Sequence, residues 1–304
     1  MKNKVTILVS SCDLYEDAWE PFFRLWNIQW RDCPYEAVLC TETKQYSCDF
    51  MQVKTINTGK DISWTARLRM ALKQIDTEYV LFALEDFFLL EKVNEDLFNQ
   101  AVELLDNNPK IGRINFMWKR LKDEFREVPG EACYFKLMPK NAKMRTNVLV
   151  SLWRKEYFLK LLYMDEDPWQ YENEAPIRSR YAGYEIYTQR YAVSAPIFHY
   201  CMNPADGLGI TERKWLKDNR ALFEKHGISD VNFDTLGFFE KQITYDEIRE
   251  KRTEEFLNSL SGAKKARELA YNFIRDLKKK LKFRKKTKIK KHLKYWWYYR
   301  SYKG

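Results

Sequence analysis

Two adjacent carboxylates, Glu85 and Asp86, are the residues of this sequence whose types and spacing most clearly suit chemistry. They follow an apolar run at 78–84 and precede the apolar residues of 87–90. Divalent cations such as Mn²⁺ and Mg²⁺ prefer oxygen ligands and share them readily with phosphate groups. The pair is therefore a candidate site for a metal-bound diphosphate. The alternative is that both acids only cap the strand or a following turn.

Strands and helices that alternate along the chain must position this pair. The length and the β-branched or aromatic content of 78–84 indicate a strand covered on both faces. The i, i+3, i+4, i+7 spacing of apolar residues in 62–75 predicts a helix, with Asp61 or Ser63 as its N-cap. Further strands are predicted at 5–10, 36–42, 51–56, 112–118 and 148–153, and further helices at 18–30, 95–106 and 154–162.

This alternation predicts an α/β fold with a mostly parallel central sheet flanked by helices. Ligands of such sheets bind just beyond the carboxyl ends of the strands. Residues 165–209 are predicted to be rich in loops, and the chain beyond Thr211 to be mainly helical. The polar residues at the predicted strand ends are Ser11, Asp13, Thr41, Glu42, Glu85 and Asp86.

The size and composition of the chain suit an enzyme with a sizeable core. Its 304 residues are 45% hydrophobic and 16% aromatic, which excludes a disordered chain. No window approaches 18 consecutive apolar residues, so we expect no membrane-spanning helix, and we interpret the apolar start at 5–10 as a strand. The six cysteines form no C-x-x-C pair, which favours free thiols in a reducing cytoplasm.

The basic charge is concentrated at the carboxyl end. Residues 262–304 contain 17 lysines and arginines and two acids, whereas residues 1–261 have a net charge of −5. Helix propensity is high over 263–294, and the aromatic segment YWWYYRSY follows. Lys and Arg bind anionic lipid surfaces, and Trp and Tyr favour the membrane interface. We therefore expect 263–304 to attach the protein to the inner face of the plasma membrane.

Two other interpretations of the basic segment remain open. It is compatible with a solvated charged helix. It is also compatible with a tail that binds phosphate backbones and stacks on bases, which would make the chain a nucleic-acid-binding protein. Deletion of 263–304 separates these interpretations from membrane attachment.

The segment SWTARLRMALKQIDTEYVLFALEDFFLL, at 63–90, resembles the donor-binding half of GT-A glycosyltransferases. The likeness is strongest to bacterial enzymes that make capsule, lipopolysaccharide and other surface polysaccharides. The opening VTILVSSCDLYEDAWEPFFRLW also resembles the start of such proteins, and the likeness extends over roughly residues 4–230. It implies a GT-A-like domain at 1–235 and a helical, basic extension at 236–304.

The resemblance implies an activity and a set of nucleotide-binding residues. The activity is inverting transfer of a sugar from a nucleoside-diphosphate donor to a surface polysaccharide or a lipid-linked glycan. Ser11 and Asp13 would lie near the nucleotide. Glu42 would approach the base or ribose, and Arg67 would lie by the base or the pyrophosphate.

The same resemblance implies a divalent cation, Mn²⁺ or Mg²⁺. Asp86 matches the last acid of a DXD-like motif and would touch the metal, while Glu85 takes the middle position. Leu84 stands where the family has its first acid. His199, near the carboxyl end of the likeness, is the candidate that completes the metal shell. The alternative for His199 is a hydrogen-bonded structural residue.

The segment DEDPWQYENEAPIRSR, at 165–180, resembles a P-W-x-aromatic-E element placed where an acceptor is expected. Inverting transfer needs a carboxylate that takes the proton of the acceptor hydroxyl. Glu172 is the candidate base. Trp169 and Tyr171 are candidates for stacking on a sugar ring, although plain packing is the alternative. The other candidates for the base are Glu174 and Glu185.

A cluster of Gly207, Gly209, Lys214 and Trp215 resembles a loop that closes over the diphosphate. Arg213 or Lys214 would then supply a positive charge opposite the diphosphate. The alternative is an ordinary loop that leads into a helix.

Overall fold

The chain is described here from a computed structural model. The structure describes residues 4–116, 134–142, 145–190, 196–200 and 209–239. The chain divides into two units, 1–238 and 239–304, of which the second lies outside the described residues apart from its first residue. The predicted domain boundary at 235/236, the basic helix at 263–294 and the membrane attachment of 263–304 therefore stay predictions.

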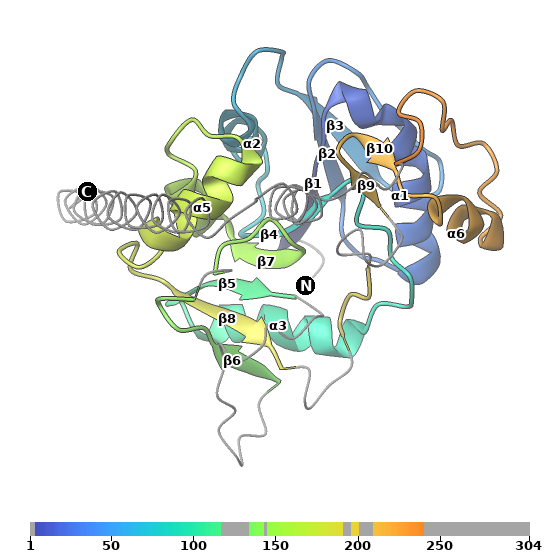
Figure 1. Cartoon of the computed structure of the whole chain (residues 1–304). Coiled ribbons are helices and arrows are strands. Elements are labelled where there is room, and N and C mark those ends of the chain that lie inside the picture. The colour runs from blue at the N-terminus through green and yellow to red at the C-terminus, as the bar shows by residue number, and fades with distance from the viewer. Residues whose placement is uncertain (1–3, 117–133, 143–144, 191–195, 201–208, 240–304) are drawn as a thin grey trace, which may run out of the picture. The chain divides into compact units, whose positions relative to one another are not determined.

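The described part contains an eight-stranded sheet in the order β3-β2-β1-β4-β7-β5-β8-β6 (Figure 1). Its strands are β1 (Val5–Ser10), β2 (Ala37–Thr41), β3 (Val53–Asn57), β4 (Tyr79–Leu84), β5 (Ile111–Asn115), β6 (Phe135–Leu137), β7 (Ser151–Arg154) and β8 (Glu185–Gln189). Only β7 and β6 run against the other six strands. The prediction of a mostly parallel sheet is confirmed.

Helices cover both faces of the sheet. They are α1 (Glu16–Gln29), α2 (Trp64–Leu72), α3 (Glu95–Asn107), α4 (Lys155–Leu161) and α5 (Pro168–Arg178), with the short α6 (Asn219–Lys225) further along the chain. Ile7 and Leu81 face a core that includes Trp26 of α1 and Phe98 of α3. Phe82 faces the other side, where its ring meets those of Trp64 in α2 and Phe158 in α4.

The strands of the amino-terminal half of the sheet form because their side chains are buried on both faces. All six residues of β1 are buried, as are all five of β2. Such strands need apolar residues at consecutive positions, which is the pattern the sequence shows. The helix predicted at 62–75 is α2, and its N-cap is Ser63, whose side chain accepts a hydrogen bond from the amide of Ala66.

The segment 165–209 corrects the prediction of a loop-rich region, because it contains α5 and β8. Asp167 caps α5 through a capping box with Gln170, and Pro168 occupies the first turn. Both features favour a helix start. The sequence Asp-Pro-x-Gln carries this information, so the helix was detectable from the residues alone.

The segment beyond 209 corrects the prediction of a mainly helical chain within the described residues. It begins with a hairpin of β9 (Ile210–Thr211) and β10 (Lys214–Trp215), and the seven-residue helix α6 follows. The residues from 229 to 237 form no helix. The hairpin matters because β9 contacts the acidic pair.

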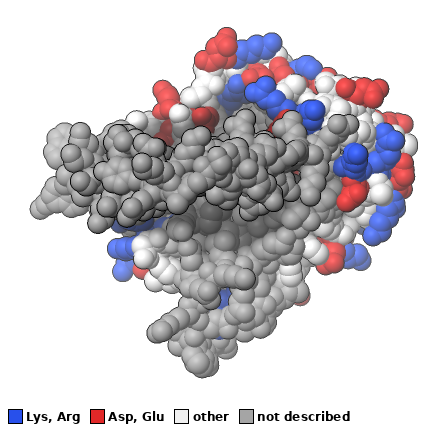
Figure 2. All heavy atoms as spheres, viewed as in Figure 1, with Lys and Arg blue, Asp and Glu red and all other residues white. Residues whose placement is uncertain are grey.

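Surface charge on the described part is mixed. Figure 2 shows Lys and Arg side chains interspersed with Asp and Glu side chains over the described surface of the face in view. The excess of basic residues belongs to 262–304, outside the described residues. In the part of the chain that the structure describes, no helix is both long and apolar enough to cross a membrane.

Candidate functional site

The carboxyl ends of β1, β2 and β4 bring the predicted donor residues to one edge of the sheet. Ser10 pairs in register with Cys40 on one side and Leu84 on the other. The residues that follow these three therefore leave the sheet side by side, among them Ser11 and Glu85. We call this group of residues, with Arg67 of α2, the donor edge; it comprises Ser10, Ser11, Asp13, Glu42, Arg67, Glu85 and Asp86.

Asp13 fixes the loop after β2. Its Oδ1 accepts hydrogen bonds from the amides of Glu42, Thr43 and Lys44 at 3.2, 2.9 and 3.1 Å, and its Oδ2 accepts one from the Thr43 hydroxyl at 2.5 Å. Partial burial by itself would raise the pKa of this carboxyl, but the Thr43 hydroxyl and the loop amides lower it to about 2. Asp13 is thus an ionised clamp at neutral pH.

Glu42 connects Asp13 to the helix on the other side. Its Oε2 accepts a hydrogen bond from the amide of Asp13 at 3.2 Å, and its Oε1 forms an ion pair with Nη2 of Arg67. The side chain of Arg67 is 13% exposed, and its Nε is buried without a partner in the structure. An unused donor on a fixed, always-charged fork is suited to an anionic or carbonyl-bearing ligand.

Two tryptophans hold the serines at the end of β1. Nε1 of Trp19, from α1, donates to Oγ of Ser11 at 2.7 Å, and Nε1 of Trp64, from α2, donates to Oγ of Ser10 at 2.9 Å. Each hydroxyl is therefore oriented by an indole from an opposite face of the sheet. Sequence reasoning had not assigned a role to either tryptophan, because an indole partner for a serine leaves no local pattern.

Glu85 and Asp86 form an acidic pair in which Glu85 is buried and Asp86 is half-buried. Burial, together with the charge of Asp86, raises the pKa of Glu85 well above its usual value. Burial also raises the pKa of Asp86, to about 6. Adjacent carboxylates with little access to water ionise less readily, and a bound cation would favour their ionised forms. The burial of Glu85 is unlike a solvated strand cap.

The β9–β10 hairpin reaches the acidic pair. The amide of Ile210 donates to Oδ2 of Asp86 at 3.2 Å. The two turn residues, Glu212 and Arg213, have φ angles of 49° and 62°. A two-residue hairpin turn of this kind requires positive φ at both positions, and residues other than Gly and Asn adopt it at a cost of about 1–2 kcal/mol each. The strained turn exposes Arg213.

Tyr15 and Cys12 border the same place. Burial and the charge of Glu85 raise the pKa of Tyr15 to about 12, and Arg213 opposes that shift. Burial and Glu85 raise the pKa of the Cys12 thiol to about 11. The acidic pair, a phenol and the hairpin arginine are thus within electrostatic reach of one another. Cys12 is a free thiol, as are Cys33, Cys40 and Cys48, the other cysteines of the described residues.

The donor set of the acidic pair fits a divalent cation in part. Carboxylate oxygens are the ligands that Mg²⁺ and Mn²⁺ prefer, and a cation would favour the ionised forms of both carboxylates. Within the described residues, no group of three or more His, Cys, Asp and Glu side chains surrounds a common metal position. The remaining ligands would have to come from the bound diphosphate and water.

His199 is placed beside a different acid. Its Nδ1 lies 3.0 Å from Oε2 of Glu91, and its carbonyl accepts from the amide of Leu90 at 2.7 Å. These contacts suit a hydrogen-bonded structural residue. A role of His199 as a partner of Asp86 in a metal shell stays a prediction.

Glu172 lies on α5, and α2 contacts both α5 and β2. Its Oε1 accepts a hydrogen bond from the amide of Val148 at 2.9 Å. One carboxylate oxygen is thereby oriented by backbone. Tyr171 is 1% exposed and its ring meets Trp64 at 5.4 Å, so it packs and does not offer a stacking surface. Trp169, by contrast, is 77% exposed.

The two alternative candidates for the base, Glu174 and Glu185, lie at different places in the fold. Glu174 lies on α5 two residues after Glu172, and Glu185 begins β8, where its amide bonds to the carbonyl of Lys110. Glu185 is thus at the amino end of a strand parallel to β5, the end opposite to the donor edge. That position disfavours Glu185 as a base for chemistry at the donor edge.

A buried arginine lies behind Glu172. Arg113, on β5, is fully buried, donates to the carbonyl and side-chain oxygens of Asn147 at 2.7 Å each, and lies over the ring of Trp153 at 4.3 Å. Burial lowers its pKa to about 10, and the charge of Glu172 is among the influences that oppose this shift.

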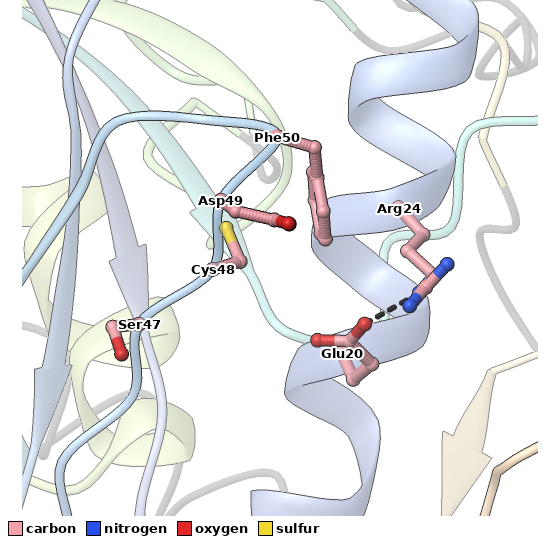
Figure 3. Close-up of a pocket in the computed structure, with 6 residues that line it drawn as sticks. All are labelled: Glu20, Arg24, Ser47, Cys48, Asp49 and Phe50. Carbon is pink, nitrogen blue, oxygen red and sulfur yellow. Dashed lines mark hydrogen bonds and ion pairs between the residues drawn. The ribbon is translucent and has the colours of Figure 1, made fainter.

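A hollow lies elsewhere, between α1 and the loop after β2 (Figure 3). The guanidinium of Arg24 pairs with Glu20 and lies 5.4 Å from the ring of Phe50. The hollow contains none of the predicted site residues. Its lining residues are Glu20, Arg24, Ser47, Cys48, Asp49 and Phe50.

Comparison with known proteins gives structural likenesses only. No protein-family model and no curated protein matches the sequence. S. aureus TarS 1-349 aligns with a TM-score of 0.42 and 16% identity over 67% of this chain and 61% of that one. A mannosyltransferase from Pyrobaculum calidifontis, solved with GDP-Man and Mn²⁺, aligns with a TM-score of 0.39 and 15% identity over 62% and 55%.

A synthetase of CMP-2-keto-3-deoxy-manno-octonic acid, solved with CTP, aligns with a TM-score of 0.39 and 12% identity over 73% of this chain and 99% of that one. The chain thus covers about three fifths of TarS 1-349 and just over half of the mannosyltransferase. With TM-scores of 0.39 to 0.42 and identities of 12 to 16%, these likenesses carry no argument about function. We therefore take the functional assignment from the geometry of the site itself.

Proposed function

We propose that this protein is a glycosyltransferase that transfers a sugar from a nucleoside-diphosphate donor to a surface polysaccharide or a lipid-linked glycan, with inversion. The observation that carries the proposal is the pair of Glu85, which is buried, and Asp86, which is half-buried, at the carboxyl end of β4. A cation held together with a diphosphate would favour the ionised forms of these carboxylates, and ligands of such sheets bind at this edge.

The nucleotide part of the donor would bind beside β1 and β2. Asp13 is committed to the loop amides, so its role is to hold that loop and not to contact the nucleotide directly. Glu42 and Arg67 would approach the base or ribose as an ion pair whose side chains are 20% and 13% exposed. Ser11 shapes the edge through its hydrogen bond from Trp19.

The diphosphate would lie at the acidic pair and under the hairpin. A divalent cation, Mn²⁺ or Mg²⁺, held by Asp86 with Glu85 adjacent, supplies positive charge that stabilises the leaving diphosphate. Arg213, presented by the strained turn of β9–β10, supplies a second positive charge near the same place. The amide of Ile210 keeps Asp86 oriented toward the hairpin.

The acceptor would approach from α5. Glu172 takes the proton of the attacking hydroxyl through the oxygen that Val148 does not engage. Trp169 offers an exposed aromatic face one helical turn earlier, which suits the apolar C–H face of a sugar ring. Tyr171, buried against Trp64, serves to position α5.

The proposal is tested by incubating the purified protein with a panel of UDP- and GDP-sugars, with Mn²⁺ and with EDTA, and measuring release of the nucleoside diphosphate. We expect release from one nucleotide sugar, and its loss in Asp86→Ala. A protein that releases no nucleoside diphosphate from any donor, and whose melting temperature no donor raises, contradicts the proposal. Deletion of 263–304 should leave donor binding intact, whereas a nucleic-acid-binding protein would lose its function with that segment.

A further inference from the structure

Helix α2 contacts both the donor edge and the helix that bears Glu172 (Figure 1). Trp64 and Arg67 face the donor edge through Ser10 and Glu42. Thr65 and Arg69 face the segment 162–166, which leads into α5. Successive residues of one short helix therefore hold the two sides of the proposed site at a fixed separation.

Thr65 makes several hydrogen bonds with the segment before α5. Its amide donates to the carbonyl of Glu166 at 3.1 Å, and its hydroxyl accepts from the amide of Glu166 at 2.8 Å. The same hydroxyl donates to the carbonyl of Met164 at 2.7 Å. The side chain is fully buried. A hydroxyl that both donates and accepts here cannot be replaced by a methyl group without leaving backbone groups unpaired.

Arg69 reinforces the same junction one turn later. Its Nη1 donates to the carbonyls of Leu162 and Met164, the latter at 3.0 Å, and its Nη2 pairs with Asp165 at 2.5 Å. Arg69 is only half-buried, so its removal is better tolerated by the fold than removal of the Thr65 hydroxyl. The two residues thus offer variants of different severity at one place.

The junction determines where α5 begins and how it is oriented. Asp167, directly after Glu166, is the N-cap of α5. The carboxylate of Glu166 forms a bidentate ion pair with Arg178, at the far end of α5, with distances of 2.5 and 2.6 Å. Both side chains are buried. Fixing Glu166 therefore fixes both ends of the helix, and Glu172 lies between them.

We propose that Thr65 is a positioning residue that holds α5, and with it Glu172, in register with the donor edge. The inference rests on the function proposed above. Displacement of a catalytic group by about 1 Å lowers turnover by up to about 100-fold, even when the change lies away from the reacting atoms. Thr65 touches neither the donor edge nor Glu172, so its removal should affect turnover without affecting nucleotide affinity.

The test compares Thr65→Val, which keeps the shape of the side chain and removes the hydroxyl, with Thr65→Ser, which keeps the hydroxyl. Thr77→Val is the matched control, because the Thr77 hydroxyl donates to Oγ1 of Thr6 and to the carbonyl of Tyr79 at the opposite end of the sheet. The probe is whichever UDP- or GDP-sugar the wild-type protein hydrolyses. The readouts are its Kd, the kcat for release of the nucleoside diphosphate, and amide hydrogen exchange of 166–178.

For Thr65→Val we expect kcat to fall about 10-fold or more, Kd to stay within about twofold, and exchange of 166–178 to accelerate while that of 37–44 does not. Thr65→Ser and Thr77→Val should keep the wild-type kcat. If Thr65→Val fails to fold, Arg69→Leu takes its place, with the same split between kcat and Kd expected and a smaller fall in kcat.

Two results overturn the inference while leaving the proposed function standing: a wild-type kcat in the folded variant, or a Kd that weakens in parallel with kcat. A fall of kcat in Thr65→Ser, which keeps the hydroxyl, also contradicts the inference. If the wild-type protein binds and hydrolyses none of the nucleotide sugars, the proposed function fails first. In that case hydrogen exchange alone decides whether Thr65 holds α5.

Discussion

The two halves of the sheet use charged side chains in opposite ways. In the half formed by β3, β2, β1 and β4, ionic groups stand at the carboxyl edge, where Asp13 and Glu42 bind the loop after β2 and Arg67. In the half formed by β7, β5, β8 and β6, they lie inside, where Arg113 and Arg145 are fully buried. The first half presents polar groups to a ligand, and the second uses them to hold loops together.

The difference explains why each half carries a different part of the proposed reaction. A donor with a diphosphate needs polar groups at an accessible edge, and the half formed by β3, β2, β1 and β4 provides such an edge. A base needs a carboxylate that is held firmly, and Glu172 is held by the amide of Val148. Substitutions in the two halves should therefore have different consequences, and the following predictions test this, from the largest expected effect to the smallest.

The largest effect is expected for Asp86→Asn. The substitution keeps an oxygen for the amide of Ile210 and removes a charge from the proposed metal position. Turnover should fall about 1000-fold or more, whereas the free energy of unfolding in metal-free buffer should not fall, because the amide oxygen still accepts from Ile210. Urea denaturation and product release measure the two quantities. A variant that is both active and less stable would show that Asp86 is a structural cap.

The next effect is expected for Arg113→Met. Removing this guanidinium takes away one donor from the carbonyl of Asn147 and one from Oγ of Ser151. The free energy of unfolding should fall by about 2–4 kcal/mol. Arg24→Met is the control: that exposed pair with Glu20 contributes about 0.3–0.5 kcal/mol. If both variants lost the same free energy of unfolding, the charged side chains of the two halves would not differ in their contribution to stability.

A smaller effect, on the rate of turnover, is expected for Glu172→Gln. The amide oxygen still accepts from Val148, so the fold should be kept, but the group no longer takes a proton. Turnover should fall about 100-fold with an unchanged Kd for the nucleotide sugar. Glu174→Gln, two residues along the same helix, is the matched control. Loss of turnover in Glu174→Gln instead would move the base to that residue.

The smallest effect is expected for Asp13→Asn. The folded-state pKa of Asp13, about 2, lies below its usual 3.8, so the ionised clamp stabilises the protein above pH 4 and this contribution is lost as the pH falls toward 2. Allowing for solvent screening, the variant should be less stable by about 1 kcal/mol at pH 7. Chemical denaturation at pH 7 and pH 3 tests this, and a gap that widens toward pH 3 would rule out the clamp.

The sequence predicted the strands of the half formed by β3, β2, β1 and β4 well, because the positions of these strands follow from local pattern. Strands buried on both faces have uninterrupted apolar runs, as in 5–10 and 78–84, and Ser63 is a standard helix cap. The other half depends on contacts far apart in the chain. The reversed direction of β7 between β4 and β5 is set by pairing, and the three residues of β6 are too few to show a pattern.

The candidate site divides in the same way. The position of Glu85 and Asp86 followed from their place at a strand end. That Asp13 serves the loop at 42–44, 29 to 31 residues away, did not follow, because a carboxylate's partners depend on how loops meet at the edge. His199 was assigned by resemblance, and its pairing with Glu91 did not follow from the sequence, because it depends on how residues 108 positions apart meet.

Calorimetric titration of the preferred nucleotide sugar into the wild-type protein and into Asp86→Asn, with Mn²⁺ and with EDTA, tests the central claim most directly. If the acidic pair binds the diphosphate through a cation, the wild-type protein should bind the donor in Mn²⁺, lose at least about 10-fold in affinity in EDTA, and show no metal dependence once Asp86 is replaced. Equal affinity of both proteins under both conditions would contradict the assignment of Glu85 and Asp86 as the centre of the donor site.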